Sequence, residues 1–141
     1  MSHDASIPLW RSIAVLVGRL VFAGVFIMAA AFKFADINGT AAYIAGAGFS
    51  FPLFLAWVAA IFEILLVIGF VTGAFFAEIA LLAAAYVLLL AFSFYGPSNW
   101  GDQMKMGSFI NHFIFIAGLL FAAVHGPGQW AIRRTLIGRY R

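Results

Sequence analysis

The sequence contains no cysteine, and only 9% of its 141 residues are charged. The missing cysteines exclude disulfide bonds, thiol redox chemistry and thiolate metal sites. The scarcity of charge excludes a disordered chain, which would be rich in charge and poor in aromatic residues. It also excludes a soluble globular domain, in which about a quarter of the residues are charged.

Apolar and aromatic residues make up most of what the sequence does contain. The hydrophobic fraction is 65%, there are 17 phenylalanines, and the mean hydropathy is +1.06. A soluble fold of this length has too little interior to hide so much apolar surface. The composition therefore predicts an integral membrane protein, which contacts the lipid bilayer.

Four apolar stretches are long enough to cross a membrane as α-helices, which requires about 20 residues each. They cover residues 12–34, 52–72, 75–95 and 107–125. Glycine, proline, asparagine and aspartate separate them, so we expect loops at 35–51 and 96–106 and a tight helical hairpin at 72–74. The sequence thus predicts an all-α, four-helix transmembrane bundle that forms a single domain over residues 1–141.

Basic residues predict the orientation of this bundle. The first apolar stretch is too long for a signal peptide, so we expect the first helix to be retained. Arg11 and four arginines in the C-terminal tail lie on one side of the membrane, whereas Lys33 and Lys105 lie on the other. The positive-inside rule therefore predicts that both termini are cytoplasmic. The tail arginines are also suited to contact anionic lipid.

Ionisable side chains inside a span each cost roughly 2.5–3.5 kcal/mol on insertion scales, so each one needs a physical explanation. Glu63 lies near the middle of the second span on a face rich in alanine, and we expect it to point into the bundle. Arg19, in the first span, keeps its charge and is its expected partner. If they pair, the two residues form either a structural ion pair or a functional site. If they do not pair, Arg19 instead snorkels to the membrane interface.

Four further residues complete the candidate set. Lys33 lies at the end of the first span, where its ammonium group can snorkel to the membrane surface. Glu78 lies in the first turn of the third span, where its negative charge either complements the positive end of the helix dipole or pairs with Arg19. Asn111 lies on a small-residue face of the fourth span, so we expect it to be buried and hydrogen-bonded. His112 follows Asn111 in the sequence. It is either a hydrogen-bonded structural residue or part of a functional site. We expect no metal site and no nucleic-acid binding, because no motif for either is present.

The order and spacing of several residues resemble a known family. They are Arg19, the stretches 26–33, 38–43, 51–63 and 69–72, Phe109 with Asn111, and residues 126–128. Together they resemble the DoxX family of small four-helix proteins of bacterial inner membranes. The resemblance implies that the family's recurrent polar residues fall on Arg19, Lys33, Glu63 and Asn111. The sequence departs from the family pattern at Ala30, Gly73 and Ile110.

The resemblance implies a fold, but fold alone does not transfer function. The family includes a subunit of an archaeal thiosulfate:quinone oxidoreductase. The small size of the chain, its lack of catalytic motifs and its phenylalanine-rich spans leave three hypotheses. The first is an accessory or assembly subunit of a respiratory or redox membrane complex, with partner subunits or further copies of the chain. The second is a quinone-binding oxidoreductase component that uses a buried Arg19 and Glu63 site with His112. The third is a small-solute permease. Catalytic residues stay unassigned, and quinone is the one cofactor considered.

Overall fold

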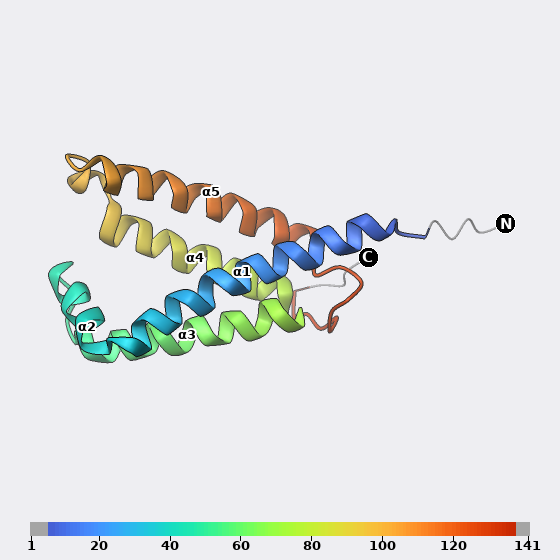
Figure 1. The fold of residues 1–141 in the computed structure, drawn as a ribbon, viewed down its shortest axis with the longest axis horizontal. Coiled ribbons are helices and arrows are strands. Elements are labelled where there is room, and N and C mark those ends of the chain that lie inside the picture. The colour runs from blue at the N-terminus through green and yellow to red at the C-terminus, as the bar shows by residue number, and fades with distance from the viewer. Residues whose placement is uncertain (1–5, 138–141) are drawn as a thin grey trace.

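The computed structural model describes residues 6–137, and this part of the chain is all-helical (Figure 1). Four helices are long and apolar enough to cross a membrane: α1 (Leu9–Ala35), α3 (Pro52–Thr72), α4 (Phe76–Tyr95) and α5 (Gln103–His125). A short 3-10 helix, η1 (Pro97–Asn99), lies between α4 and α5. The prediction of an all-α bundle with four transmembrane helices is confirmed, and α1 and α5 begin slightly earlier than expected.

The first predicted loop contains a helix, which corrects the expectation for residues 35–51. α2 (Ile37–Gly46) begins after Asp36, whose carboxylate accepts a 2.8 Å hydrogen bond from the Gly39 amide. Such an N-terminal cap satisfies a helix amide that has no partner within the helix. The buried side of α2 packs on the start of α3. A cap and one apolar face are therefore enough to hold a helix in a segment whose glycines indicated a turn.

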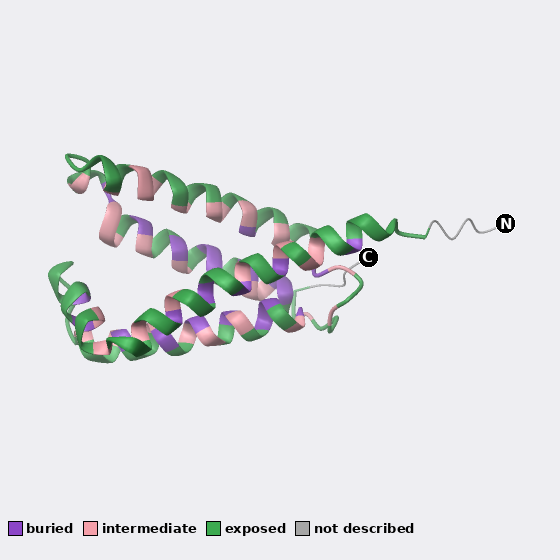
Figure 2. Cartoon of the chain, viewed as in Figure 1, coloured by how far each residue is buried: buried purple, intermediate pink, exposed green. Residues whose placement is uncertain are grey.

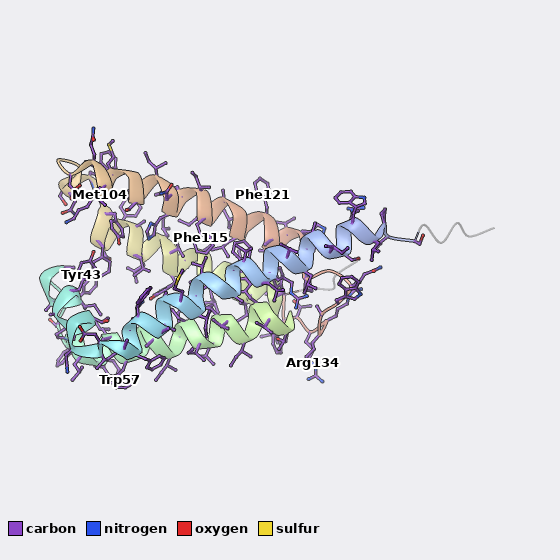
Figure 3. The ribbon with its side chains drawn as sticks, in the orientation of Figure 1. Tyr43, Trp57, Met104, Phe115, Phe121 and Arg134 are labelled. Atoms are coloured by element: carbon purple, nitrogen blue, oxygen red, sulfur yellow. The ribbon has the colours of Figure 1, made fainter. Side chains whose placement is uncertain are left out.

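The four long helices form two pairs that diverge toward one end of the molecule. α1 packs along α3, and α4 packs along α5. In Figure 1 the pairs lie close together where the described chain begins and ends, and far apart at the end that carries α2. α1 and α5 meet through Phe115, whose ring centroid lies 5.5 Å from that of Phe22 and 5.6 Å from that of Phe26 (Figure 3).

The core relies on small residues that let helices approach closely. α4 contributes five buried alanines, Ala77, Ala80, Ala83, Ala84 and Ala91. In a bilayer, close packing replaces the hydrophobic effect as the force that joins helices. Gly69 of α3 is the tightest case within the four spanning helices, since a Cβ there would lie 2.5 Å from Ile79 Cγ1. By contrast, α5 is mostly exposed and so presents most of its surface to lipid (Figure 2).

The predicted hairpin between the second and third spans is confirmed, and the segment after α5 packs beside it. Gly73 ends α3 at φ +73°, a left-handed conformation that glycine adopts without strain. On either side of it, the Ile132 amide donates to Thr72 O at 2.9 Å and the Phe75 amide donates to Arg134 O at 2.8 Å. The end of the described chain is therefore fastened to the same end of the bundle where α1 begins.

Candidate functional site

A cavity of about 720 Å³ lies between the diverging helix pairs. Side chains from α1, α2, α3 and α4 line it, together with His112 of α5, and most of them are apolar or aromatic. α2 bridges the pairs through Tyr43 (labelled in Figure 3), whose ring stacks on Phe94 of α4 at a centroid distance of 4.8 Å. A volume of roughly 300–1,000 Å³ is typical of sites for small organic ligands, so this cavity is large enough to bind one.

An ion pair lies at the wall of this cavity. Lys33 Nζ donates to Glu63 Oε1 at 2.8 Å, and the Tyr86 hydroxyl donates to the same oxygen at 2.8 Å. Glu63 is 1% exposed, whereas the Lys33 side chain is 20% exposed and lines the cavity together with Tyr86. An ammonium group has three donors, and Lys33 uses one of them on Glu63. Two donors therefore stay available to a molecule in the cavity.

Glu63 thus pairs with Lys33 and not with Arg19, which corrects the expected pair. Side chains on a helix lean toward its N-terminus. Because α1 and α3 run antiparallel, Arg19 leans toward the C-terminal end of α3, while Glu63 leans toward its N-terminal end. Lys33 leans back along α1 and meets Glu63 there. Residues at similar depth along two antiparallel helices can therefore reach away from each other.

Arg19 binds backbone carbonyl groups. Its guanidinium donates to Phe70 O, Val71 O, Pro127 O and Trp130 O at 2.9, 2.5, 3.1 and 2.6 Å. The first two carbonyls belong to the last turn of α3, where carbonyl groups have no partner within the helix. The other two belong to the segment after α5. Arg19, which is 2% exposed, therefore joins α3 to the end of the described chain. It neither snorkels nor takes part in the cavity.

His112 and two tyrosines contribute polar atoms to the outer rim of the cavity. His112 Nδ1 lies 2.7 Å from Ser108 O, and its ring centroid lies 4.9 Å from that of Tyr95. If Nδ1 carries the proton, Nε2 is an acceptor available to a ligand. Burial raises the pKa of the Tyr43 hydroxyl, and its hydrogen bond with Tyr95 raises it further. Tyr43 is therefore neutral at physiological pH.

Asn111 is exposed, which contradicts the expectation that it is buried. It shares a face of α5 with Phe115, the residue through which α5 meets α1. Asn111 lies one turn farther toward the diverging end, where α1 has moved away. Within the described residues, its side chain therefore has no helix opposite it to accept or donate a hydrogen bond.

Glu78 lies in the first turn of α4, as expected, but it does not share Arg19. Its Oε1 accepts hydrogen bonds from the Thr135 hydroxyl at 2.8 Å, from the Ile137 amide at 3.0 Å and from the Leu136 amide. Glu78 therefore binds the segment after α5, at the opposite end of α4 from the cavity.

Comparisons with known proteins agree with this architecture. The family model described as DoxX matches residues 14–96, which is more than half of the chain. The chain belongs to the DoxX family. One relative is the "Inner membrane protein YqjF" of Escherichia coli (strain K12), which is 30% identical over 130 residues, covering 89% of this chain and 94% of the relative. No solved structure matches the chain significantly. With four spanning helices, these similarities establish a multi-pass inner membrane protein.

The region that matches the DoxX model supplies every wall of the cavity except His112. Within this region, Tyr86 is a polar residue that the sequence argument missed. The turn between α3 and α4 contains Ala74 and Phe75, and Glu63 precedes Ala74 by as many residues as Tyr86 follows Phe75. A tight antiparallel hairpin places such positions at the same depth, so the sequence did contain a signal for this contact. For Tyr43 there was none, because its segment was expected to be a loop.

Proposed function

We propose that this DoxX protein binds a quinone-class molecule in its cavity, as a membrane subunit of a redox complex. The observation that carries the proposal is the network of Lys33, Glu63 and Tyr86 at the wall of an otherwise apolar cavity. A quinone combines an apolar ring and tail with two carbonyl oxygens. Sites for such ligands need aromatic or aliphatic walls and a few well-placed donors. Lys33 supplies donors, and Phe62 and Phe94 are among the apolar walls.

The same network is suited to supply protons. Reduction of a quinone to a quinol takes two electrons and two protons. Lys33 faces the cavity, and its ammonium group can give one proton to a ring oxygen. The second proton, and the proton that restores the ammonium group beside the Glu63 carboxylate, come from water. The proposal assigns binding and proton supply to this chain, and it assigns electron supply to a partner redox subunit. A complex of this kind joins the accessory-subunit hypothesis with the quinone hypothesis.

The test is the quinone content of the protein purified in mild detergent from its native membrane, measured by chromatography of the extracted lipid. We expect wild-type protein to retain quinone in a stoichiometric amount. Ala59→Phe fills the cavity and should lower retention about tenfold, because a site blocked by a ring cannot hold a second one. Ala85→Phe is the matched control, since Ala85 is exposed and lies outside the cavity lining. Equal quinone content in both variants would overturn the proposal.

A specific observation favours a partner helix beside α5, as the accessory-subunit hypothesis requires. Asn111 is an exposed amide within a spanning helix, where an unpaired polar group is costly. Asparagine side chains join membrane helices by hydrogen bonds. We therefore expect Asn111→Leu to release a co-purifying partner or second copy that wild-type protein retains. Ile110→Leu, at an exposed apolar neighbour, should retain it.

The permease hypothesis has the least support. A transported solute needs a path that continues past the cavity to the other end of the bundle. At that end Arg19 is packed against backbone carbonyl groups, and Phe70, Phe76 and Leu119 are almost fully buried. Transport by this chain in proteoliposomes would revive the hypothesis.

A further inference from the structure

A second, smaller cavity of about 170 Å³ lies at the opposite end of the bundle from the first. The start of α1 forms one side of it, and the end of α5 with the segment that follows forms the other. Three of its lining residues, Arg11, His125 and Arg133, are basic or can become so. We call this site the arginine pocket. It shares no lining residue with the cavity described above and is independent of the proposed function.

The arginine pocket is rich in hydrogen-bond donors without partners. Within the described residues, the Arg11 guanidinium donates to no acceptor, and Arg133 uses only Nε, which donates to Gly128 O at 3.3 Å. The Ser12 hydroxyl donates to Gln129 Oε1 at 3.0 Å and so fixes the Gln129 amide, whose nitrogen has no acceptor among these residues. The pocket therefore presents two guanidinium groups and an amide to whatever it holds.

No carboxylate lines the pocket within residues 6–137. The first turn of α1 also carries no acidic residue, and no side chain caps it. Two arginines in one pocket, with no acidic residue among its described lining, favour an anion.

The level of the pocket in the membrane indicates which anions can reach it. Trp10 is adjacent to Arg11 and 68% exposed, and Trp130 is adjacent to Gln129 and 48% exposed. Exposed tryptophans at the ends of spans typically lie at the level of the lipid headgroups. Guanidinium groups match phosphate oxygens in geometry and charge. We infer that the arginine pocket binds a phosphate group, carried by an anionic phospholipid or by a soluble phosphate.

Native mass spectrometry of the full chain, delipidated and titrated with phosphatidylglycerol, tests this inference. Wild-type protein should bind one lipid in preference to further ones. The double variant Arg11→Gln/Arg133→Gln should weaken that binding about tenfold, because each arginine contributes to attraction of an anionic headgroup. Arg134→Gln is the matched control, since Arg134 is exposed, lies outside the pocket and points away from the bundle in Figure 3. It removes the same kind of charge from the adjacent position and should leave binding within about twofold.

A parallel titration with inorganic phosphate separates the two sources. Phosphate that fails to displace phosphatidylglycerol at millimolar concentration identifies the lipid as the ligand. Phosphate that binds wild-type protein alone, and requires Arg11 and Arg133, identifies a soluble ligand for the same site. Equal losses in Arg134→Gln and in the double variant would overturn the inference, as would binding that no variant changes. If the double variant does not fold, the single variants Arg11→Gln and Arg133→Gln are compared with Arg134→Gln in the same way.

Discussion

At the scale of single residues, the Glu63 carboxyl depends most directly on one ionic partner, Lys33. It is 1% exposed, and both donors that it binds converge on one oxygen, while Oε2 has no partner in the described chain. A buried carboxylate that loses its cation keeps the cost of desolvation without the compensating attraction. For stability, Lys33 and Glu63 should therefore behave as one unit, in which each charge is needed only because the other is present.

Replacement of one partner and then of both tests this coupling. Lys33→Met should lower the free energy of unfolding by roughly 3–5 kcal/mol, because it leaves Glu63 unpaired. Lys33→Met/Glu63→Leu should recover most of this loss, since no buried charge is left. The measurement is unfolding in detergent, followed by circular dichroism. Lys105→Met, at a residue outside any ion pair of the described chain, serves as the control. A double variant as unstable as the single one would contradict the pairing.

At the scale of helices, close approach depends on residues without bulk. Gly69 lies where α3 meets α4, and the side chain of Ile79 occupies the space that a Cβ would need. The α3–α4 hairpin also sets the depth of Tyr86 relative to Glu63. Spacing between these two helices therefore controls the hydrogen bond at the cavity wall.

Addition of one methyl group tests this spacing. Gly69→Ala should destabilise the protein by about 1–3 kcal/mol, because the new Cβ forces Ile79 or the helix to move. Gly118→Ala is a matched control on α5, where a Cβ would meet Phe22 Cζ at an ordinary 3.6 Å. It should be neutral or slightly stabilising. Thermal unfolding in the same detergent measures both variants, and equal stability of the two would show that the α3–α4 contact is looser than described.

At the scale of the whole molecule, both ends of the described chain meet at one end of the bundle. Ile7 and Arg133 line the same pocket, and the loop that contains η1 lies at the other end (Figure 1). Four spans require this arrangement, but which end faces the cytoplasm stays a prediction from the basic residues. That the chain forms a single domain stays a prediction as well.

The absence of cysteine makes the orientation simple to measure. Single cysteines are introduced as Ser6→Cys near the start of α1 and Ser98→Cys in η1, at two exposed positions. If both termini are cytoplasmic, a membrane-impermeant maleimide labels Ser98→Cys in intact spheroplasts and labels Ser6→Cys only after the membrane is opened. The unmodified chain should stay unlabelled in both conditions. The reverse pattern would place both termini outside.

The sequence by itself determined the class of the protein, the spans and most of the polar residues that matter. Span length and hydropathy are local properties, so Pro52–Thr72 was predicted at its observed bounds, and the DoxX resemblance was sound. The cost of an ionisable group in lipid is also local, which is why Lys33 and Glu63 were singled out.

Only the tertiary structure decided how those residues combine. The partner of Glu63 depends on the direction in which side chains lean on antiparallel helices, and this moved Arg19 to the α3 carbonyls. The exposure of Asn111 and the existence of the cavity depend on how far the helix pairs diverge, which no local pattern encodes. The segment Ile37–Gly46 is too short to form a stable helix from its own helix propensity, and it is stabilised by packing on α3.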